Sequence, residues 1–153
     1  MSGRDCRAAA DELATSFEGL PDWESRYRRV IALGQELPEL DPVLKTTDRF
    51  LIEGCVSRAW LVPGRAGTSM TLQGDSESSI VKGILALLIR VYSGALPEQV
   101  LACEPEFLGR IGLTEHLSMN RRNGLSQVIK QIKLYAAVFL AQDRAASAES
   151  HPD

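Results

Sequence analysis

The sequence has few cysteines, few histidines, no excess of positive charge and no long apolar run. Three cysteines and two histidines among 153 residues leave little material for a disulfide framework or a metal site. A net charge of −3 argues against general nucleic-acid binding, which needs a basic surface. The longest apolar run, residues 80–92, is broken by Lys82 and Arg90 and is shorter than the roughly 20 residues of a membrane span. Together these absences favour a globular domain without a resident metal ion.

The remaining composition is that of one folded domain. Hydrophobic residues make up 44% and charged residues 24%, which is an ordinary globular balance. The N-terminus carries charges but no apolar core, so we expect no secretory signal. An odd number of cysteines leaves at least one thiol free, which fits a reducing cytoplasm. We expect a single cytoplasmic domain over residues 1–153, with a core at about 8–142 and a flexible tail at 143–153.

Apolar spacing predicts helices at both ends of the chain. A short helix is expected over 8–17, and a second one begins after Pro21 and Asp22 and has a possible stop at Gly34. An apolar helix over 80–92 belongs in the middle of the domain, a short helix follows over 97–108, and the last begins near Ser118. We expect that last helix to fray from Arg144.

The middle of the chain changes to the period of strands. Alternation and turn residues over 50–55, 59–62 and 69–73 predict short antiparallel strands. Asp75 or Ser76 then caps the following helix. The expected fold class is α+β, with a small antiparallel three-stranded sheet packed against helices.

Cys55 is the candidate for chemistry. It follows Gly54, which allows the backbone to turn sharply at the end of a strand. A thiol reacts as its thiolate, which nearby cations such as Arg58 or Arg121 stabilise. The alternative is a buried structural cysteine, since free cysteine is among the most buried residue types.

Other residues have two interpretations each. Arg121 either supports a thiolate or contacts a partner, or it is solvated in the first turn of the last helix, where the helix dipole disfavours a cation. Asp75 is a candidate contact residue but is interpreted first as a helix cap. Trp23 and Trp60 are interpreted as core aromatics. His116 would pair with Cys55 only in a cysteine–histidine hydrolase.

Four segments together resemble the SufE family. They are Asp-Trp-Glu to Arg-Tyr at 22–27, Gly-Cys-Val-Ser-Arg-Ala-Trp-Leu at 54–61, the run from Gly-Asp-Ser to Lys-Gly-Ile at 74–84, and Leu-Ser-Met-Asn-Arg-Arg-Asn-Gly-Leu at 117–125. They stand in the family's order, and the resemblance extends over residues 17–141.

The resemblance implies a sulfur-acceptor protein. Proteins of this family take sulfur from the persulfide of a pyridoxal-phosphate cysteine desulfurase of the SufS or CsdA type, stimulate that enzyme, and pass the sulfur to an iron–sulfur scaffold such as SufBCD. The persulfide-carrying cysteine matches Cys55, and the flanking glycine and the arginine of the last motif match Gly54 and Arg121. The implied fold is shared with IscU-type scaffolds. The acceptor would be non-enzymatic and would hold no cofactor, because the pyridoxal phosphate belongs to the desulfurase.

The sequence departs from the family pattern at a few positions. Ala59 replaces an aliphatic residue, Glu77 replaces Asp, and Met119-Asn120 replaces Pro-Ser in the last motif. These changes leave the choice between SufE and CsdE open. Cys6 and Cys103 match nothing in the pattern.

Two other functions remain as alternatives. An iron–sulfur scaffold would need about three cysteines at one cluster. A thiol hydrolase would use Cys55 and His116 without a desulfurase. Homodimerisation is possible in any of these cases, and we expect no membrane partner.

Overall fold

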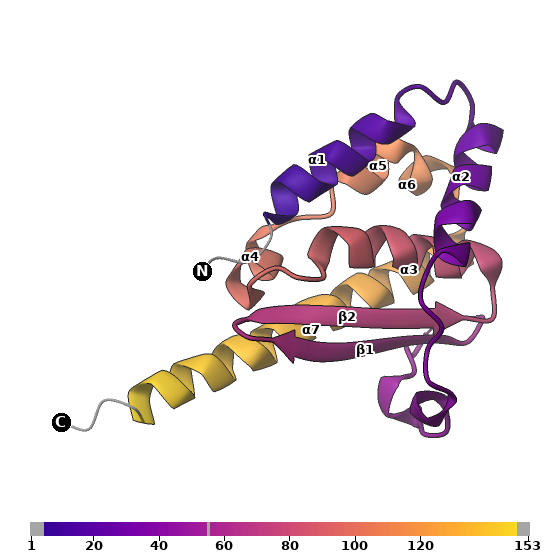
Figure 1. Cartoon of the computed structure of the whole chain (residues 1–153). Helices are drawn as coiled ribbons and strands as arrows, with labels where there is room; N and C mark the ends of the chain where they lie inside the picture. Colours follow the sequence, from indigo (N-terminus) through magenta and orange to yellow (C-terminus); the bar gives the residue numbers. More distant parts are fainter. Residues whose placement is uncertain (1–4, 55, 150–153) are drawn as a thin grey trace.

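The fold is known from a computed structural model, which describes residues 5–54 and 56–149 (Figure 1). Its elements in chain order are α1 (Cys6–Phe17), α2 (Trp23–Gln35), η1 (Pro42–Lys45), η2 (Asp48–Phe50), β1 (Ala59–Ala66), β2 (Ser69–Ser76), α3 (Ser79–Tyr92), α4 (Pro97–Ala102), α5 (Phe107–Ile111), α6 (Leu113–His116) and α7 (Met119–Glu149). Helices flank a small sheet on both sides in the sequence, so the α+β prediction is confirmed.

The sheet is a hairpin. Strands β1 and β2 pair antiparallel from Ala59 opposite Ser76 to Ala66 opposite Ser69. A tight turn joins them, and Gly67 takes a φ of +62° there. Within the described residues the sheet has two strands, so the prediction of three is wrong.

The missing strand was expected over residues 50–55. Residues 48–50 instead form the 3₁₀ turn η2, in which the Thr47 hydroxyl accepts from the amide of Arg49. Leu51 makes a single bridge to Trp60, and Gly54 then turns away with a φ of +85°. The extended segment between these two turns is too short to form a ladder.

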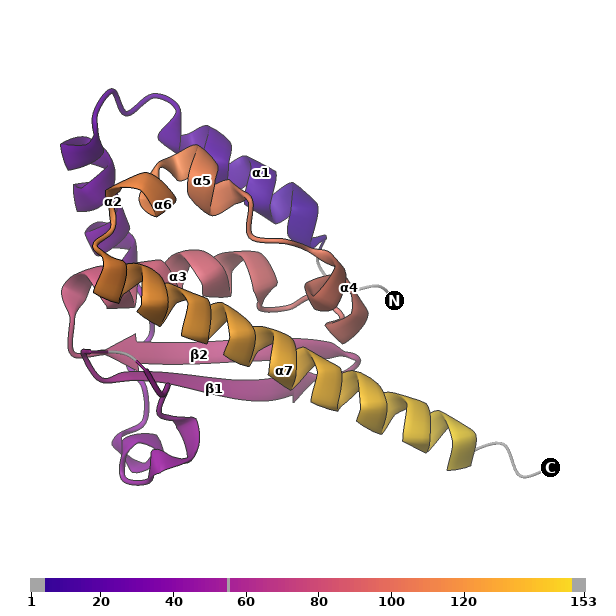
Figure 2. The same ribbon diagram turned by 180° about the vertical axis from the view of Figure 1, so that it is seen from behind.

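Helix α3 lies at the centre, as its apolar sequence predicts. Nine of its residues are buried, including Ile84, Leu87 and Tyr92. It packs on α1 and α2 on one side and on β2 and α7 on the other (Figures 1 and 2). Burial on nearly every side explains why this helix carries few polar residues, with Arg90 on the exposed side.

Helices α2 and α3 cross at two glycines. A Cβ on Gly34 would lie 2.6 Å from the backbone nitrogen of Gly83, and a Cβ on Gly83 would overlap the carbonyl group of Val30. Gly34 was considered as a possible stop of its helix, but α2 continues to Gln35. Gly34 therefore allows close contact between the two helix backbones and does not terminate α2.

Three other boundaries differ from prediction. Ser78 caps α3 through the amide of Val81. Residues 75 and 76, which were expected to cap this helix, belong to β2 instead, because β2 extends to Ser76.

The helix expected over 97–108 is split into α4 and α5 around Pro105, which has no amide hydrogen to donate. Helix α7 continues beyond Arg144 to Glu149, so its last turns are helical where fraying was expected. Whether the tail is flexible stays a prediction.

Helix α7 runs along the molecule across the hairpin, behind it in Figure 1 and in front of it in Figure 2. The Tyr135 hydroxyl donates to the carbonyl of Leu61 at 3.2 Å. Arg65 pairs with Asp143 at 3.0 Å and lies over the ring of Phe139. These contacts fix α7 along both ends of β1. No helix among the described residues is long and apolar enough to cross a membrane.

The helix crossing gives the first prediction. Gly83→Ala should lower the free energy of unfolding by about 3 kcal/mol, because the neighbour that the new methyl group meets is backbone and cannot rotate away. Urea unfolding followed by circular dichroism measures the loss. Gly109→Ala is the matched control, since its Cβ would meet nothing closer than Thr114 at 3.7 Å. Equal unfolding midpoints for the two variants would contradict the interpretation of the crossing.

Candidate functional site

The candidate site is the loop of residues 53–58, whose two ends are fixed by backbone hydrogen bonds. The amide of Ile52 donates to the carbonyl of Ala59 at 2.8 Å. The carbonyl of Arg58 accepts from the amide of Glu77 at 3.0 Å and from the Ser76 hydroxyl at 2.7 Å. Cys55 itself lies outside the described residues, so its role stays a prediction.

Gly54 is required by its conformation and by its neighbour. Its φ of +85° is in the left-handed region, which other residues adopt only with strain. A Cβ there would also lie 3.1 Å from the Cγ atom of Gln127 on α7. Glycine therefore lets the loop turn while it packs against this helix.

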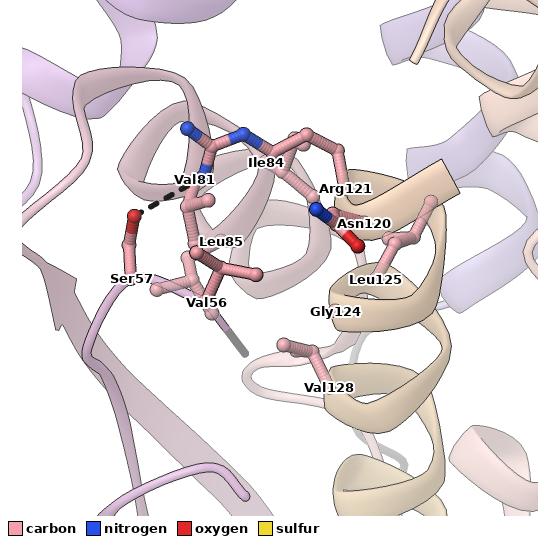
Figure 3. A pocket seen from close by; sticks show the side chains of 10 residues that line it. All are labelled: Val56, Ser57, Val81, Ile84, Leu85, Asn120, Arg121, Gly124, Leu125 and Val128. Atoms are coloured by element: carbon pink, nitrogen blue, oxygen red, sulfur yellow. Dashed lines mark hydrogen bonds between the residues drawn. The ribbon is translucent and has the colours of Figure 1, made fainter. Parts of the chain in front are cut away.

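A small cavity lies between the second half of this loop, α3 and the start of α7 (Figure 3). Its volume is about 20 Å³, room for about one water-sized group. The lining residues are mostly aliphatic, and three are polar (Ser57, Asn120 and Arg121). The full lining is Val56, Ser57, Val81, Ile84, Leu85, Asn120, Arg121, Gly124, Leu125 and Val128. Two loop residues that directly follow Cys55 thus form part of an apolar hollow.

Arg121 reaches the loop from α7. Its Nη1 atom donates to the Ser57 hydroxyl at 3.3 Å (Figure 3). Arg121 is partly buried, whereas its neighbour Arg122 is exposed. The structure therefore brings Arg121 to the loop that holds Cys55, as the sequence analysis considered, and identifies Ser57 as its partner.

One exposed apolar side chain lines the cavity, and another precedes a lining residue in the sequence. Val56 is 76% exposed although it forms part of the lining, and Met119, the residue before Asn120, is 69% exposed. Sequence reasoning did not single out Val56 or Ser57. The sequence offered one clue to Val56: it is an aliphatic residue in a turn, directly after Gly54 and Cys55, where an apolar side chain has little chance of burial.

Comparison with known proteins places this chain in a family. The family model described as "SufE: Fe-S metabolism associated domain" matches residues 11–136. The chain belongs to the SufE family. The resemblance seen in four short motifs is thereby confirmed, and the family associates the chain with iron–sulfur metabolism and sulfur transfer.

Curated SufE-like proteins match over most of their length. One from Rhizobium meliloti (strain 1021) is 38% identical over 128 residues, which are 80% of this chain and 91% of the relative. One from Rhizobium etli is 39% identical over 136 residues, which are 86% of this chain and 91% of the relative. The similarity thus extends across nearly the whole SufE domain.

A solved structure has the same fold. The solution structure of a hypothetical protein from Thermus thermophilus matches with a TM-score of 0.72, over 87% of this chain and 96% of that one. Its sequence identity is 21%, so the likeness concerns the fold alone.

Asp75 holds an ion network beside the loop of residues 53–58 rather than capping a helix. Its carboxylate pairs with Lys45, and with Lys82 at 3.4 Å. Lys45 also lies 4.8 Å from the ring centre of Trp60, which is buried as predicted. Burial raises the pKa of Asp75, but hydrogen bonds from Lys45 and the Ser76 amide and the charges of both lysines outweigh it, so the pKa lies below its ordinary value. The network ties η1 to β2 and α3.

His116 belongs to another part of the surface. Its ring stacks on Trp23 at 4.6 Å, at an interplanar angle of 9°. Both rings line a pocket with Arg26 at the junction of α2 and α6. Trp23 is half-buried. Among the described residues, those that line the cavity beside the loop of residues 53–58 do not include His116.

The described residues contain no group of three or more His, Cys, Asp or Glu side chains arranged as a metal site. Since Cys55 is outside that set, the expectation of no resident metal or cofactor stays a prediction.

The ion network gives the second prediction. Asp75→Asn should lower the free energy of unfolding at pH 7 by about 1–3 kcal/mol, because the carboxylate is 14% exposed and both lysines lose their partner. A lowered folded-state pKa adds stability above the unfolded pKa, and this is lost as pH falls through the folded value. The difference between the variant and the wild type should therefore shrink below about pH 4.

Urea midpoints measured from pH 3 to pH 8 check this. Asp143→Asn is the matched control, because that carboxylate is 46% exposed in its pair with Arg65 and should contribute less than about 1 kcal/mol. A loss for Asp75→Asn that does not change with pH would assign the effect to packing instead of charge.

Proposed function

We propose that this chain is a sulfur acceptor: Cys55 takes persulfide sulfur from a cysteine desulfurase, the chain stimulates that enzyme, and it relays the sulfur to an iron–sulfur scaffold of the SufBCD type. The observation that carries the proposal is the position of Cys55 between Gly54 and Val56, in a loop beside an apolar cavity in a SufE-family domain. The desulfurase would be of the SufS or CsdA type, and the site of action the cytoplasm.

The transfer is a thiol exchange. The Cys55 thiolate attacks the terminal sulfur of the donor persulfide, the donor's S–S bond breaks, and the donor leaves as a thiolate. Cys55 then carries the persulfide. This step needs one thiol and no metal or cofactor on the acceptor, so the carbon–sulfur chemistry remains with the desulfurase. In this sense the chain is an acceptor and activator and not an enzyme.

The surroundings of the loop suit both stages of such a relay. A persulfide is readily reduced or oxidised, and an apolar hollow with room for one small group would shield its terminal sulfur. The Arg121 guanidinium, held by Ser57, places a cation near the loop, where it would stabilise a thiolate or persulfide anion. The exposed side chains of Val56 and Met119 supply apolar contact area for the desulfurase.

A scaffold function is less well supported. Cys6 and Cys103 lie together near Tyr92, whereas the described neighbours of Cys55 pack against the N-terminal half of α3 and the start of α7. Cys6 and Cys103 therefore do not converge with the loop as cluster ligands would.

Intact-protein mass spectrometry tests the acceptor role directly. After incubation with a cysteine desulfurase and L-cysteine, the chain should gain the mass of one sulfur atom, and a reductant should remove it. Cys55→Ser should gain nothing, and Cys6→Ala, the matched control, should gain the sulfur as the wild type does. If the wild type gains no sulfur and desulfurase turnover is unaffected, the proposal is wrong.

Arg121 gives a further prediction. Arg121→Gln should slow sulfur uptake and alkylation of Cys55 by iodoacetamide about tenfold at pH 7, because the loop loses its adjacent cation. Arg122→Gln is the matched control: the same substitution, one residue later and exposed, should change both rates by less than about twofold. Unfolding midpoints measured in parallel separate a positioning role from a general loss of structure. Equal rates in the two variants would remove Arg121 from the site.

A further inference from the structure

A second pair of thiols lies away from the proposed acceptor site. Cys6 is the first residue of α1 and Cys103 directly follows α4. Both residues are buried, at 2% and 4% exposure, and no disulfide joins them. Cys6 acts on the pKa of the Cys103 thiol, and Arg7, beside Cys6, reaches the carbonyl of Ala102, beside Cys103. The fold thus brings two cysteines from distant parts of the sequence close together.

The pair lies at the far end of α3 from the cavity beside the loop. The Tyr92 hydroxyl, at the last residue of α3, donates to the carbonyl of Cys103 at 2.7 Å. Val81, at the start of α3, lines that cavity instead. The helix between these two positions is about 16 Å long. The thiol pair is therefore a separate site.

The backbone around Cys103 is held firmly. The ammonium group of Lys133 donates to the carbonyls of Val100 and Cys103 at 2.6 and 2.8 Å. Arg7, one residue after Cys6, donates to the carbonyl of Ala102 at 3.4 Å. Arg7 near the start of α1 and Lys133 on α7 thereby hold the segment that carries Cys103 beside α1.

The pair also has a route to solvent. Cys103 lines an open pocket of about 390 Å³, with Arg7 and Arg110 among its walls. Burial raises the pKa of the Cys103 thiol, and the charges of Lys133 and Arg7 together with the Cys6 hydrogen bond offset part of that effect. A small reagent in the pocket therefore meets Cys103 before Cys6.

We propose that Cys6 and Cys103 form a redox-active dithiol site that low-molecular-weight disulfides oxidise to an intramolecular disulfide. The Cys103 thiolate attacks the reagent disulfide and releases one small thiol. The Cys6 thiolate then attacks the Cys103 sulfur of the mixed disulfide and releases the second. Two protein thiols are oxidised, one small disulfide is reduced to two thiols, and the protons end on those thiols.

The bond would connect α1 to the segment after α4. It would close a loop that holds well over half of the domain, which restricts the unfolded chain far more than a short loop does. The expected result is a melting temperature about 10 °C higher in the oxidised form, provided the bond forms without strain.

The test uses the Cys55→Ser chain, so that its outcome does not depend on sulfur acceptance. The folded protein is incubated with oxidised glutathione at pH 8, denatured in N-ethylmaleimide and weighed intact. We expect a loss of two hydrogens, no maleimide adduct, a cross-linked peptide containing both cysteines, and a raised melting temperature that dithiothreitol reverses. The wild-type chain, with Cys55 alkylated in the folded state, repeats the measurement without the substitution.

A matched variant tests the order of attack. With Cys6→Ala added, the mixed disulfide cannot be resolved, so one glutathione should stay on Cys103. Two maleimide adducts after oxidation, stable glutathione on both cysteines, or a cross-link that forms only in denaturant would each overturn the proposal. Failure of sulfur uptake by wild-type Cys55 would leave this result unchanged, so the two proposals fail independently.

Discussion

The close crossing of α2 and α3 is the contact on which the rest of the fold depends. Helix α3 is buried on nearly every side, and it can lie that deep only because Gly34 and Gly83 let the two backbones meet. With α3 fixed, its outer surfaces set the places of the hairpin, of α1 and of α7. A side chain at the crossing would shift the central helix and, with it, every element that packs on it.

Helix α7 connects this core to the candidate site. Its start carries Arg121 to Ser57, its next turns present Gln127 to Gly54, and its later turns hold β1 and the end of α4. One long helix therefore contacts the loop of residues 53–58, strand β1 and the end of α4. The site is built on this rigid element and on α3, while only the loop is irregular.

The sequence predicted what local pattern determines. The apolar run at 80–92 required a central helix, and Pro21 and Asp22 marked the start of α2 correctly. Features that depend on three-dimensional neighbours were missed. Gly34 looked like a helix end because its partner Gly83 is remote in sequence, and Asp75 looked like a cap because Lys45 and Lys82 become its neighbours only in the fold. The contact between Arg121 and Ser57 spans 64 residues, and no spacing rule would have found it.

The fixed ends of the 53–58 loop limit how far its middle can travel. The hydrogen bond between Ile52 and Ala59 anchors both ends at the edge of the hairpin. Cys55 is the third residue after Ile52, so its Cα atom can stand at most about 11 Å from that of Ile52 in any conformation of the loop. On the proposed function, a partner that exchanges sulfur with Cys55 must therefore bring its own reactive group close to the hairpin edge. The geometry makes close docking of the partner, and not long excursions of the loop, the condition for transfer.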